Sequence, residues 1–168
     1  MSKSIRKYNG VYLDGVSKVS DVTDYTPPVL ELLTEEWRAG GMFTPTHMVM
    51  GMAALSSSFV AGEDIDFLKR FGVIKNGKHI ACFVKGSLED DLTGTVTAVE
   101  DELRGKLTKV DRGTFSPGSV NLTTYEFSVD YYRYAQDGKT IHEIDPPNMV
   151  CIIDGVDLLA DHRAALGF

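Results

Sequence analysis

The residues best suited to acid–base or nucleophilic chemistry are His142 and Cys151. His142 stands beside Glu143 and close to Asp145, and such a group could move protons. On a strand, however, His142 and Glu143 would face opposite sides, so a surface role is favoured for all three. Cys151 with a distant histidine could be a nucleophile, but any chain with both residue types permits that pairing. A small hydrolase that uses Cys151 or His142 therefore stays a minor alternative.

Metal and cofactor sites have little support in the sequence. The segment HMVMGM offers one imidazole and three thioethers to a cuprous ion, through His47, Met48, Met50 and Met52. Methionine more commonly fills irregular apolar contacts and adaptable interfaces, and that interpretation is favoured here. The four histidines are dispersed, and no HExxH, GxSxG, Walker or GxGxxG pattern is present. We therefore expect no enzyme, no cofactor and no metal.

Length and composition bound the remaining possibilities. The chain has 168 residues, a formal net charge of −7 and a pI of about 5.0, which predicts one domain over residues 1–168. The acidic balance argues against a nucleic-acid-binding surface, which needs clustered Lys and Arg. The N-terminal segment lacks the apolar region of a signal peptide, and the longest nearly apolar run, residues 48–55, is too short to span a bilayer. Two isolated cysteines, Cys82 and Cys151, predict buried thiols in a reducing compartment.

The clearest structural signal is a hairpin within residues 121–157. Four apolar or aromatic residues alternate with polar ones, as in a strand with one buried face: Tyr125, Phe127, Val129 and Tyr131. Asp137-Gly138 is the dipeptide that best tolerates the positive φ angles of a tight turn. A second strand follows over residues 139–144, and Pro146 and Pro147 end it because they lack an N–H group.

Other β segments and two helices are expected around this hairpin. Strands are predicted over residues 11–13, 16–22, 79–87, 95–110 and 149–153, with turns at 14–15 and 154–155. Residues 29–36 could be a strand or a brief helix, and residues 46–60 alternate imperfectly. Helices are predicted over residues 63–71, capped by Gly72, and over 156–166, stopped by Gly167.

Two polar faces need an explanation beyond simple burial. The strand over residues 95–110 would carry Leu103 and Leu107 on one side and a water-facing charged set on the other: Glu100, Glu102, Arg104 and Lys106. The hairpin adds Tyr132 and Tyr134 to its nominally polar side, which would therefore be partly covered. Either both faces are buried in one monomer, or another subunit covers the second face or the strand edge. Closing a barrel across several subunits would remove the hazard of a long free edge.

Three blocks of the sequence resemble the major tail tube protein of contractile-tailed bacteriophages and R-type pyocins. The C-terminal block contains Tyr131-Tyr132-Arg133, Asp137-Gly138-Lys139, Glu143-Ile144-Asp145, Asn148-Met149, Asp154 to Leu159, and Arg163 to Phe168. The second block is Leu103 to Lys106 with Asp111, Gly113 and Gly118. The third is Arg38 to Met42 followed by Met50-Gly51. Pro146-Pro147 and the final Phe168 depart from the family pattern, and residues 62–97 match it only loosely.

The resemblance implies a mainly β fold with short helices, a β-sandwich or barrel subunit. Six copies would form a ring with a continuous inner β-barrel, and the rings would stack into a hollow tube. The sheath would surround this tube, which would hold the tape-measure protein, end at baseplate and tail terminator proteins and conduct DNA without binding it specifically. It would be a virion protein assembled in the host bacterial cytoplasm, without membrane contact. The alternatives are the tube of a DNA-free R-type tailocin or of a type VI secretion-like apparatus.

Residue roles within such a tube can be assigned only as expectations. The candidate subunit or ring contacts are Trp37, Arg38, Met42, Met48, Met50, Met52, Tyr132 and Tyr134. Trp37 could instead pack in its own core. The candidate lumen face is Glu100, Glu102, Arg104, Lys106, Glu126 and Asp130. A ring of six chains at −7 each carries −42, and an acidic lumen would let a polyanion slide past.

Overall fold

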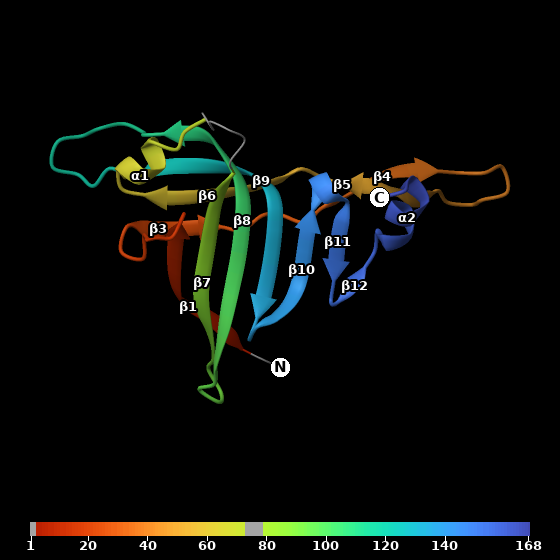
Figure 1. Ribbon diagram of the computed structural model, residues 1–168, viewed down its shortest axis with the longest axis horizontal. Coiled ribbons are helices and arrows are strands. Elements are labelled where there is room, and N and C mark those ends of the chain that lie inside the picture. The colour runs from red at the N-terminus through yellow and green to blue at the C-terminus, as the bar shows by residue number, and fades with distance from the viewer. Residues whose placement is uncertain (1–2, 73–78) are drawn as a thin grey trace.

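The computed structural model describes residues 3–72 and 79–168, and this part of the chain is mainly β-sheet with short helices (Figure 1). The N-terminal half contains β1 (Ser4–Leu13), β2 (Val16–Ser17), β3 (Val22–Thr26), β4 (Leu32–Trp37), β5 (Thr46–Met52), β6 (Leu55–Ala61) and helix α1 (Ile65–Leu68). The C-terminal half contains β7 (Ile80–Asp90), β8 (Val96–Asp111), β9 (Thr123–Gln136), β10 (Lys139–Asp145), a 3-10 helix (Pro146–Asn148), β11 (Val150–Ile153), β12 (Val156–Asp157) and α2 (Ala160–Leu166). None of the described helices is long and apolar enough to cross a membrane.

One open antiparallel sheet carries the fold. Its strand order is β12-β11-β10-β9-β8-β7-β1-β2, and β6 joins it by pairing with the first half of β9, with β3 on the outer side of β6. The second half of β9 pairs instead with β10. The strands β3 and β6 cross the upright strands β1, β7 and β8 in Figure 1, so that the sheet is folded over part of its own face.

The fold of the sheet depends on a bend in β8 and β9. The register of these strands shifts between Arg104 and Gly105, where Asp130 is the extra residue on β9. At this point the backbones approach so closely that a Cβ atom on Gly105 would lie 1.8 Å from the carbonyl oxygen of Ser128. Such bulges bend and twist a sheet. Glycine at position 105 is therefore required by the bend.

The core lies inside this bend and is rich in aromatic rings. Phe59 of β6 stacks on Tyr25 at 5.3 Å between centroids and meets Phe127 edge-on at 6.4 Å. Phe67 of α1 stacks on Tyr125 of β9 at 4.5 Å. Val11, Leu13, Cys82, Val84, Leu103 and Leu107 complete the interior. Burying this apolar surface is the main force that holds the layers together.

The predicted hairpin is confirmed, but its face assignment is wrong from position 131 onward. Asp137 and Gly138 adopt positive φ angles of 46° and 77° in the turn between β9 and β10. The extra residue in the bulge at Asp130 reverses the alternation of β9. Tyr131 consequently faces away from the core and Tyr132 faces into it, with 5% of its surface exposed.

Several element boundaries also differ from the predictions. The strand predicted at residues 11–13 extends back to Ser4, and the segment 29–36, left open between strand and helix, overlaps the strand β4 from Leu32 onward. The helix predicted over 63–71 is limited to Ile65–Leu68, because Gly72 donates its N–H to the carbonyl of Leu107 and ties the chain to β8. The C-terminal helix begins only at Ala160, because β12 precedes it.

Candidate assembly surfaces

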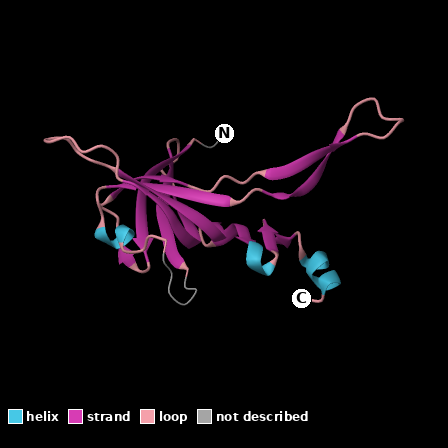
Figure 2. Cartoon of the chain, turned by 90° about the horizontal axis from the view of Figure 1, so that it is seen from above, coloured by secondary structure: helices cyan, strands magenta, loops and turns pink. Residues whose placement is uncertain are grey.

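The most exposed part of the molecule is a two-stranded ribbon that projects from the body (Figure 2). We call β4, β5 and the loop between them, residues 32–52, the arm. All six residues of β4 are exposed, as are all residues of β5 except Met52. Large apolar side chains nevertheless line the arm: Leu32, Leu33, Trp37, Phe43, Met48, Val49 and Met50. Trp37 is 52% exposed and Phe43 96% exposed, so the possibility that Trp37 packs in its own core is wrong.

The loop at the tip of the arm is held by its own residues. Arg38 donates from Nε to the carbonyl of Met42 at 3.1 Å, and the Met42 sulfur accepts from the Ala39 N–H at 3.4 Å. Met42 is accordingly half-buried within the loop. Arg38 and Met42 therefore shape the tip, whereas Trp37, Met48 and Met50 present free apolar surface. Met52, at the root of the arm, packs against the core of the body.

The total surface area supports the view that this surface has a partner. The chain exposes 10,892 Å², whereas a compact monomer of this mass exposes about 8,200 Å². An isolated two-stranded hairpin is marginally stable at best in water. Contiguous exposed apolar patches mark interaction sites. The arm is therefore the first candidate for contacts between copies of the chain.

Tyr132, predicted as a contact residue, is instead part of a buried polar cluster. Its hydroxyl donates to Oδ1 of Asp101 at 2.9 Å, and the Arg6 guanidinium lies 3.4 Å from Oδ2 of the same carboxylate. Arg6 also lies 5.9 Å from the centroid of the Tyr25 ring. Burial raises the pKa of Asp101 above its ordinary value, although Tyr132 and Arg6 oppose that shift. Asp101 was missed in the sequence because it occupies the apolar side of β8.

Tyr134 lies on the sheet beside His142, a candidate for acid–base chemistry in the sequence. Its ring stacks on His142 at 6.3 Å between centroids, and its hydroxyl accepts from the Gln136 amide at 2.9 Å. It is half-buried and leaves only part of its surface for a neighbouring subunit. Burial raises the pKa of the Cys151 thiol, which makes that thiol a poorer nucleophile. No group of three His, Cys, Asp or Glu side chains suitable for a metal occurs among the described residues.

The second candidate surface is the side of β7, β8, β9 and β10 that faces away from the core, here called the open face. Glu100, Glu102 and Arg104 lie on it, as the alternation of β8 predicted. The prediction that Glu102 faces water is wrong, because its side chain is only 6% exposed. Its two oxygens each accept from an arginine Nε at 3.0 Å, Oε1 from Arg104 and Oε2 from Arg133.

Four participants in this network were not among the predicted lumen residues. Arg133 of β9 also donates to Oε1 of Glu100 at 2.9 Å, and Lys85 of β7 lies 3.5 Å from the other oxygen of Glu100. Arg104 stacks over the ring of Tyr131 at 4.9 Å. The hydroxyl of Tyr131 in turn donates to Glu143 of β10 at 3.0 Å. The sequence signal for Arg133 and Tyr131 was hidden by the bulge at position 130.

The other candidate lumen carboxylates contact separate partners nearer the bend. Glu126 lies 3.2 Å from the Lys109 ammonium, and Asp130 lies 3.0 Å from Nδ1 of His79. Lys106 is exposed. The structure therefore joins Glu100, Glu102 and Arg104 in one cluster but keeps Glu126 and Asp130 outside it.

Comparison with known proteins identifies the class of this molecule. The chain matches the family of phage tail tube protein FII over residues 3–167. It therefore belongs to that family, whose members are structural tail tube proteins and not enzymes. The chain is a phage tail tube structural protein, a component of the virion.

Individual relatives agree with this assignment. The chain is 29% identical to the major tail tube protein of Serratia phage KSP20 over 169 residues, 98% of this chain and 96% of the relative. It is also 29% identical to the tail tube protein of Escherichia phage P2 over 164 residues, 96% and 95% of the two chains.

Solved structures with the same fold come from contractile injection systems. A chain from the sheath/tube terminator of the extracellular contractile injection system PVC has a TM-score of 0.56 and 11% identity, covering 76% of this chain and 93% of that one. A chain from the baseplate of the anti-feeding prophage has a TM-score of 0.55 and 13% identity, covering 80% and 97%. At these identities the likeness establishes the fold alone.

Proposed function

We propose that six copies of this chain close into a ring and that the rings stack into the hollow inner tube of a contractile tail. The observation that carries this proposal is the arm, an apolar ribbon that no described part of its own chain covers. In the assembled tube the arm packs on a neighbouring copy, in the same ring or in the next one. Trp37 is the anchor of this contact, and Met48 and Met50 adapt to the neighbour's surface. Tyr134 contributes its exposed part.

The ring closes through the two edges of the sheet, which join between neighbouring copies. Among the described strands, residues 5–10 of β1 pair with β7 alone, and the other end of the sheet is the two-residue strand β12. Edge strands invite pairing with another chain. A continuous inner barrel, with these edges joined between neighbouring copies, removes the hazard.

The open face lines the lumen of this tube. It consists of long strands with polar side chains, which suits a water-filled channel better than a subunit contact, whose centre is depleted of charge. Glu100, Glu102, Arg104 and Lys106 belong to this wall, with Glu126 and Asp130 closer to the bend. The tube holds the tape-measure protein during assembly in the host cytoplasm and conducts DNA during ejection. The sheath surrounds it, and baseplate and tail terminator proteins close its ends.

Electron microscopy of the chain co-expressed with a baseplate initiator tests this proposal. The expected result is tubes built from stacked hexameric rings. A chain that stays monomeric even with initiator, sheath and tape-measure proteins present contradicts it. The variant Trp37→Ala, with Val29→Ala outside the arm as the matched control, should lose tubes, while the control keeps them. Both residues are exposed, at 52% and 70%, so neither substitution removes a core contact.

A second candidate is the tube of a particle that carries no DNA. This candidate is supported by the names of the similar structures, an extracellular contractile injection system and an anti-feeding prophage. Particles purified with this chain distinguish the two functions. Heads filled with DNA support the phage tail, whereas headless particles support the injection apparatus.

A further inference from the structure

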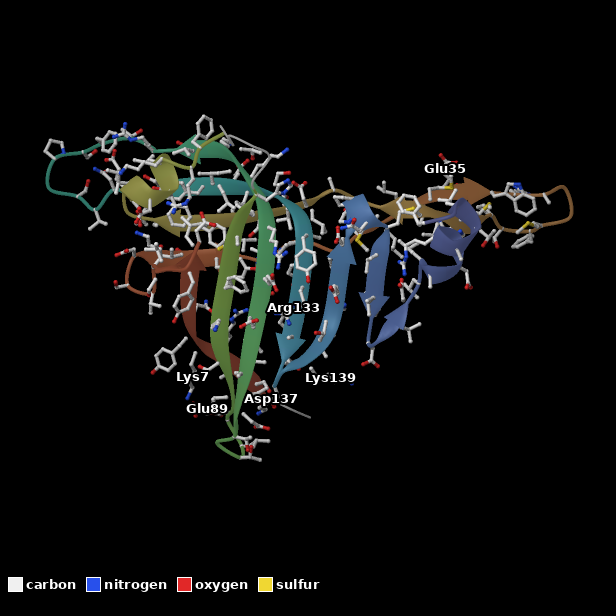
Figure 3. All side chains as sticks on the ribbon, viewed as in Figure 1. Lys7, Glu35, Glu89, Arg133, Asp137 and Lys139 are labelled. Atoms are coloured by element: carbon white, nitrogen blue, oxygen red, sulfur yellow. The ribbon has the colours of Figure 1, made fainter. Side chains whose placement is uncertain are left out.

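The open face carries balanced charges that are tied together across four strands. Three cations and three carboxylates take part: Lys85, Arg104, Arg133, Glu100, Glu102 and Glu143. Arg133 lies in the middle of the long strands, well away from the arm residue Glu35 (Figure 3). The formal charge of this group is zero, whereas the whole chain carries −7. The acidity of the protein is therefore not concentrated at this place.

Two of the three cations, Lys85 and Arg104, are the most exposed of the side chains joined by these ion pairs. The side chains of Lys85 and Arg104 are 58% and 53% exposed, whereas that of Glu102 is 6% exposed. Glu102 is thus covered by the guanidinium groups that it holds, and Glu100, at 31% exposed, lies between Lys85 and Arg133. A molecule that approaches the face therefore meets Lys85 and Arg104 before it meets Glu102, whereas Arg133, at 27% exposed, lies as deep as Glu100.

Such cations would bind a nucleic acid if they were free. Guanidinium groups match phosphate oxygens with paired N–H donors, and arginine and lysine replace counterions along a phosphate backbone. Here the Nε donors of Arg104 and Arg133 are engaged by Glu102, and Glu100 takes a further donor of Arg133. The stacking of Arg104 on Tyr131 fixes the plane of its guanidinium as well.

We propose that Glu100 and Glu102 keep Arg104 and Arg133 from binding the phosphates of a nucleic acid that moves along the open face. The carboxylates act as internal competitors for phosphate, which leaves a wall that is polar and neutral and releases DNA readily. The inference rests on the proposed function for its setting in the lumen. Its chemical core, that the two carboxylates mask a phosphate-binding surface, concerns the single chain.

The first test measures binding of a fluorescent DNA duplex to the unassembled full-length chain. Glu100→Gln/Glu102→Gln should bind the duplex at least about tenfold more tightly than the parent chain at low salt. Its affinity for DNA should also fall more steeply with salt concentration, by the amount expected for about two additional phosphate contacts. The matched control is Glu63→Gln/Asp154→Asn. It changes the net charge equally and frees the partners Arg112 and Lys139, which are not members of the charged cluster on the open face. It should leave DNA binding unchanged.

A third variant separates masking from net charge. Adding Arg133→Gln to the double variant should remove about half of the gain in salt dependence, because one of the two freed phosphate ligands is lost while Arg104 remains. Glu100→Gln alone leaves Glu102 in place and should give an intermediate gain, which keeps the test valid if the double variant folds poorly. Equal binding by the double variant and its control, or no gain in either, overturns the proposal.

The second test uses assembled tubes and asks whether the masked face lines the lumen. Tubes of the double variant should retain single DNA strands after sedimentation, whereas tubes of the parent and of the control should release them. A gain of binding in the free chain that disappears in tubes overturns the lumen assignment. A parent chain that forms no tubes contradicts the proposed function, while the masking itself is still decided by the first test.

Discussion

The body and the arm of this protein are made of the same kind of strand but differ in what covers them. In the body, β6 and β9 place Phe59, Tyr125 and Phe127 in an interior where each is at most 2% exposed. In the arm, β4 and β5 are similarly rich in large apolar residues, yet Trp37 and Met50 remain more than half exposed. The body satisfies its apolar surface within one chain, and the arm does not.

Under the proposed function, this difference separates the residues that fold the subunit from those that assemble it. A chain that already buries an aromatic core has no need of the arm to fold. Conversely, an apolar ribbon held only by its own hairpin hydrogen bonds is not independently stable. Substitutions in the body should therefore lower the free energy of unfolding of the free chain, whereas substitutions in the arm should act on assembly.

The largest expected effect comes from the glycine at the bend. In Gly105→Ala the new Cβ atom would lie 1.8 Å from the Ser128 carbonyl oxygen, so β8 and β9 must separate. We expect a loss of about 4 kcal/mol or more in the free energy of unfolding, measured by urea denaturation. Gly40 in the loop of the arm has no atom within 4 Å of its Cβ position, and Gly40→Ala should change stability by less than about 1 kcal/mol. Equal effects of the two substitutions would contradict the distinction between body and arm.

Truncating one aromatic residue in the body and one in the arm gives the next largest effect on the free energy of unfolding. Phe59→Ala removes a ring that is fully buried between Tyr25 and Phe127, and it should cost about 3–5 kcal/mol in the free chain. Trp37→Ala should cost less than about 1 kcal/mol there, because half of the indole is already in water. Urea denaturation measures both values. A large loss of free-chain stability on truncating Trp37 would mean that the arm packs on its own subunit.

The sequence predicted the hairpin well because its signals are local. The alternation from Tyr125 to Val129 and the Asp137-Gly138 turn depend on nothing outside the segment. The bulge at Asp130 is different, since it arises from the close pairing of Gly105 with a strand distant in sequence. One extra residue then exchanged the roles of Tyr131 and Tyr132.

Charged positions were the hardest to place from sequence. Asp101 has the wrong polarity for a core position, and only the tertiary arrangement brings Arg6 and Tyr132 to it. Glu102 was placed on the correct face of β8, but its burial depends on Arg133, which comes from another strand. The Trp and Met content of the arm predicts a contact surface; the structure shows that Trp37, Met48 and Met50 are exposed, and the contact itself stays a prediction. The residue types of a surface predict what it can bind. They predict less well which of its charged side chains form ion pairs with one another.

Hydrogen exchange gives a finer test of the contrast. Amides of β4 and β5 in the free chain should open with a free energy of about 1 kcal/mol or less, because no layer covers the ribbon. Amides of β8 and β9 should be protected nearly to the global stability, about 5–15 kcal/mol. In assembled tubes the arm should gain protection while the body changes little. Strong protection of β4 in the free chain would contradict this expectation.

The smallest expected effect is the pH dependence of stability that comes from Asp101, the buried carboxyl group of the body. Because burial raises the pKa of Asp101, the folded state holds its proton more tightly than the unfolded state. The stability contributed by this proton is full below the ordinary aspartate pKa and is lost as the pH rises through the raised pKa. Asp157 has the opposite sign, because the hydrogen bond from Arg163 lowers its pKa, so its contribution is lost as the pH falls.

Urea denaturation from pH 3 to 8 should therefore show that Asp101→Asn removes a decline of stability with rising pH. Asp157→Asn should instead remove a decline with falling pH. Equal slopes for the parent and Asp101→Asn would mean that the Arg6 and Tyr132 contacts cancel the effect of burial.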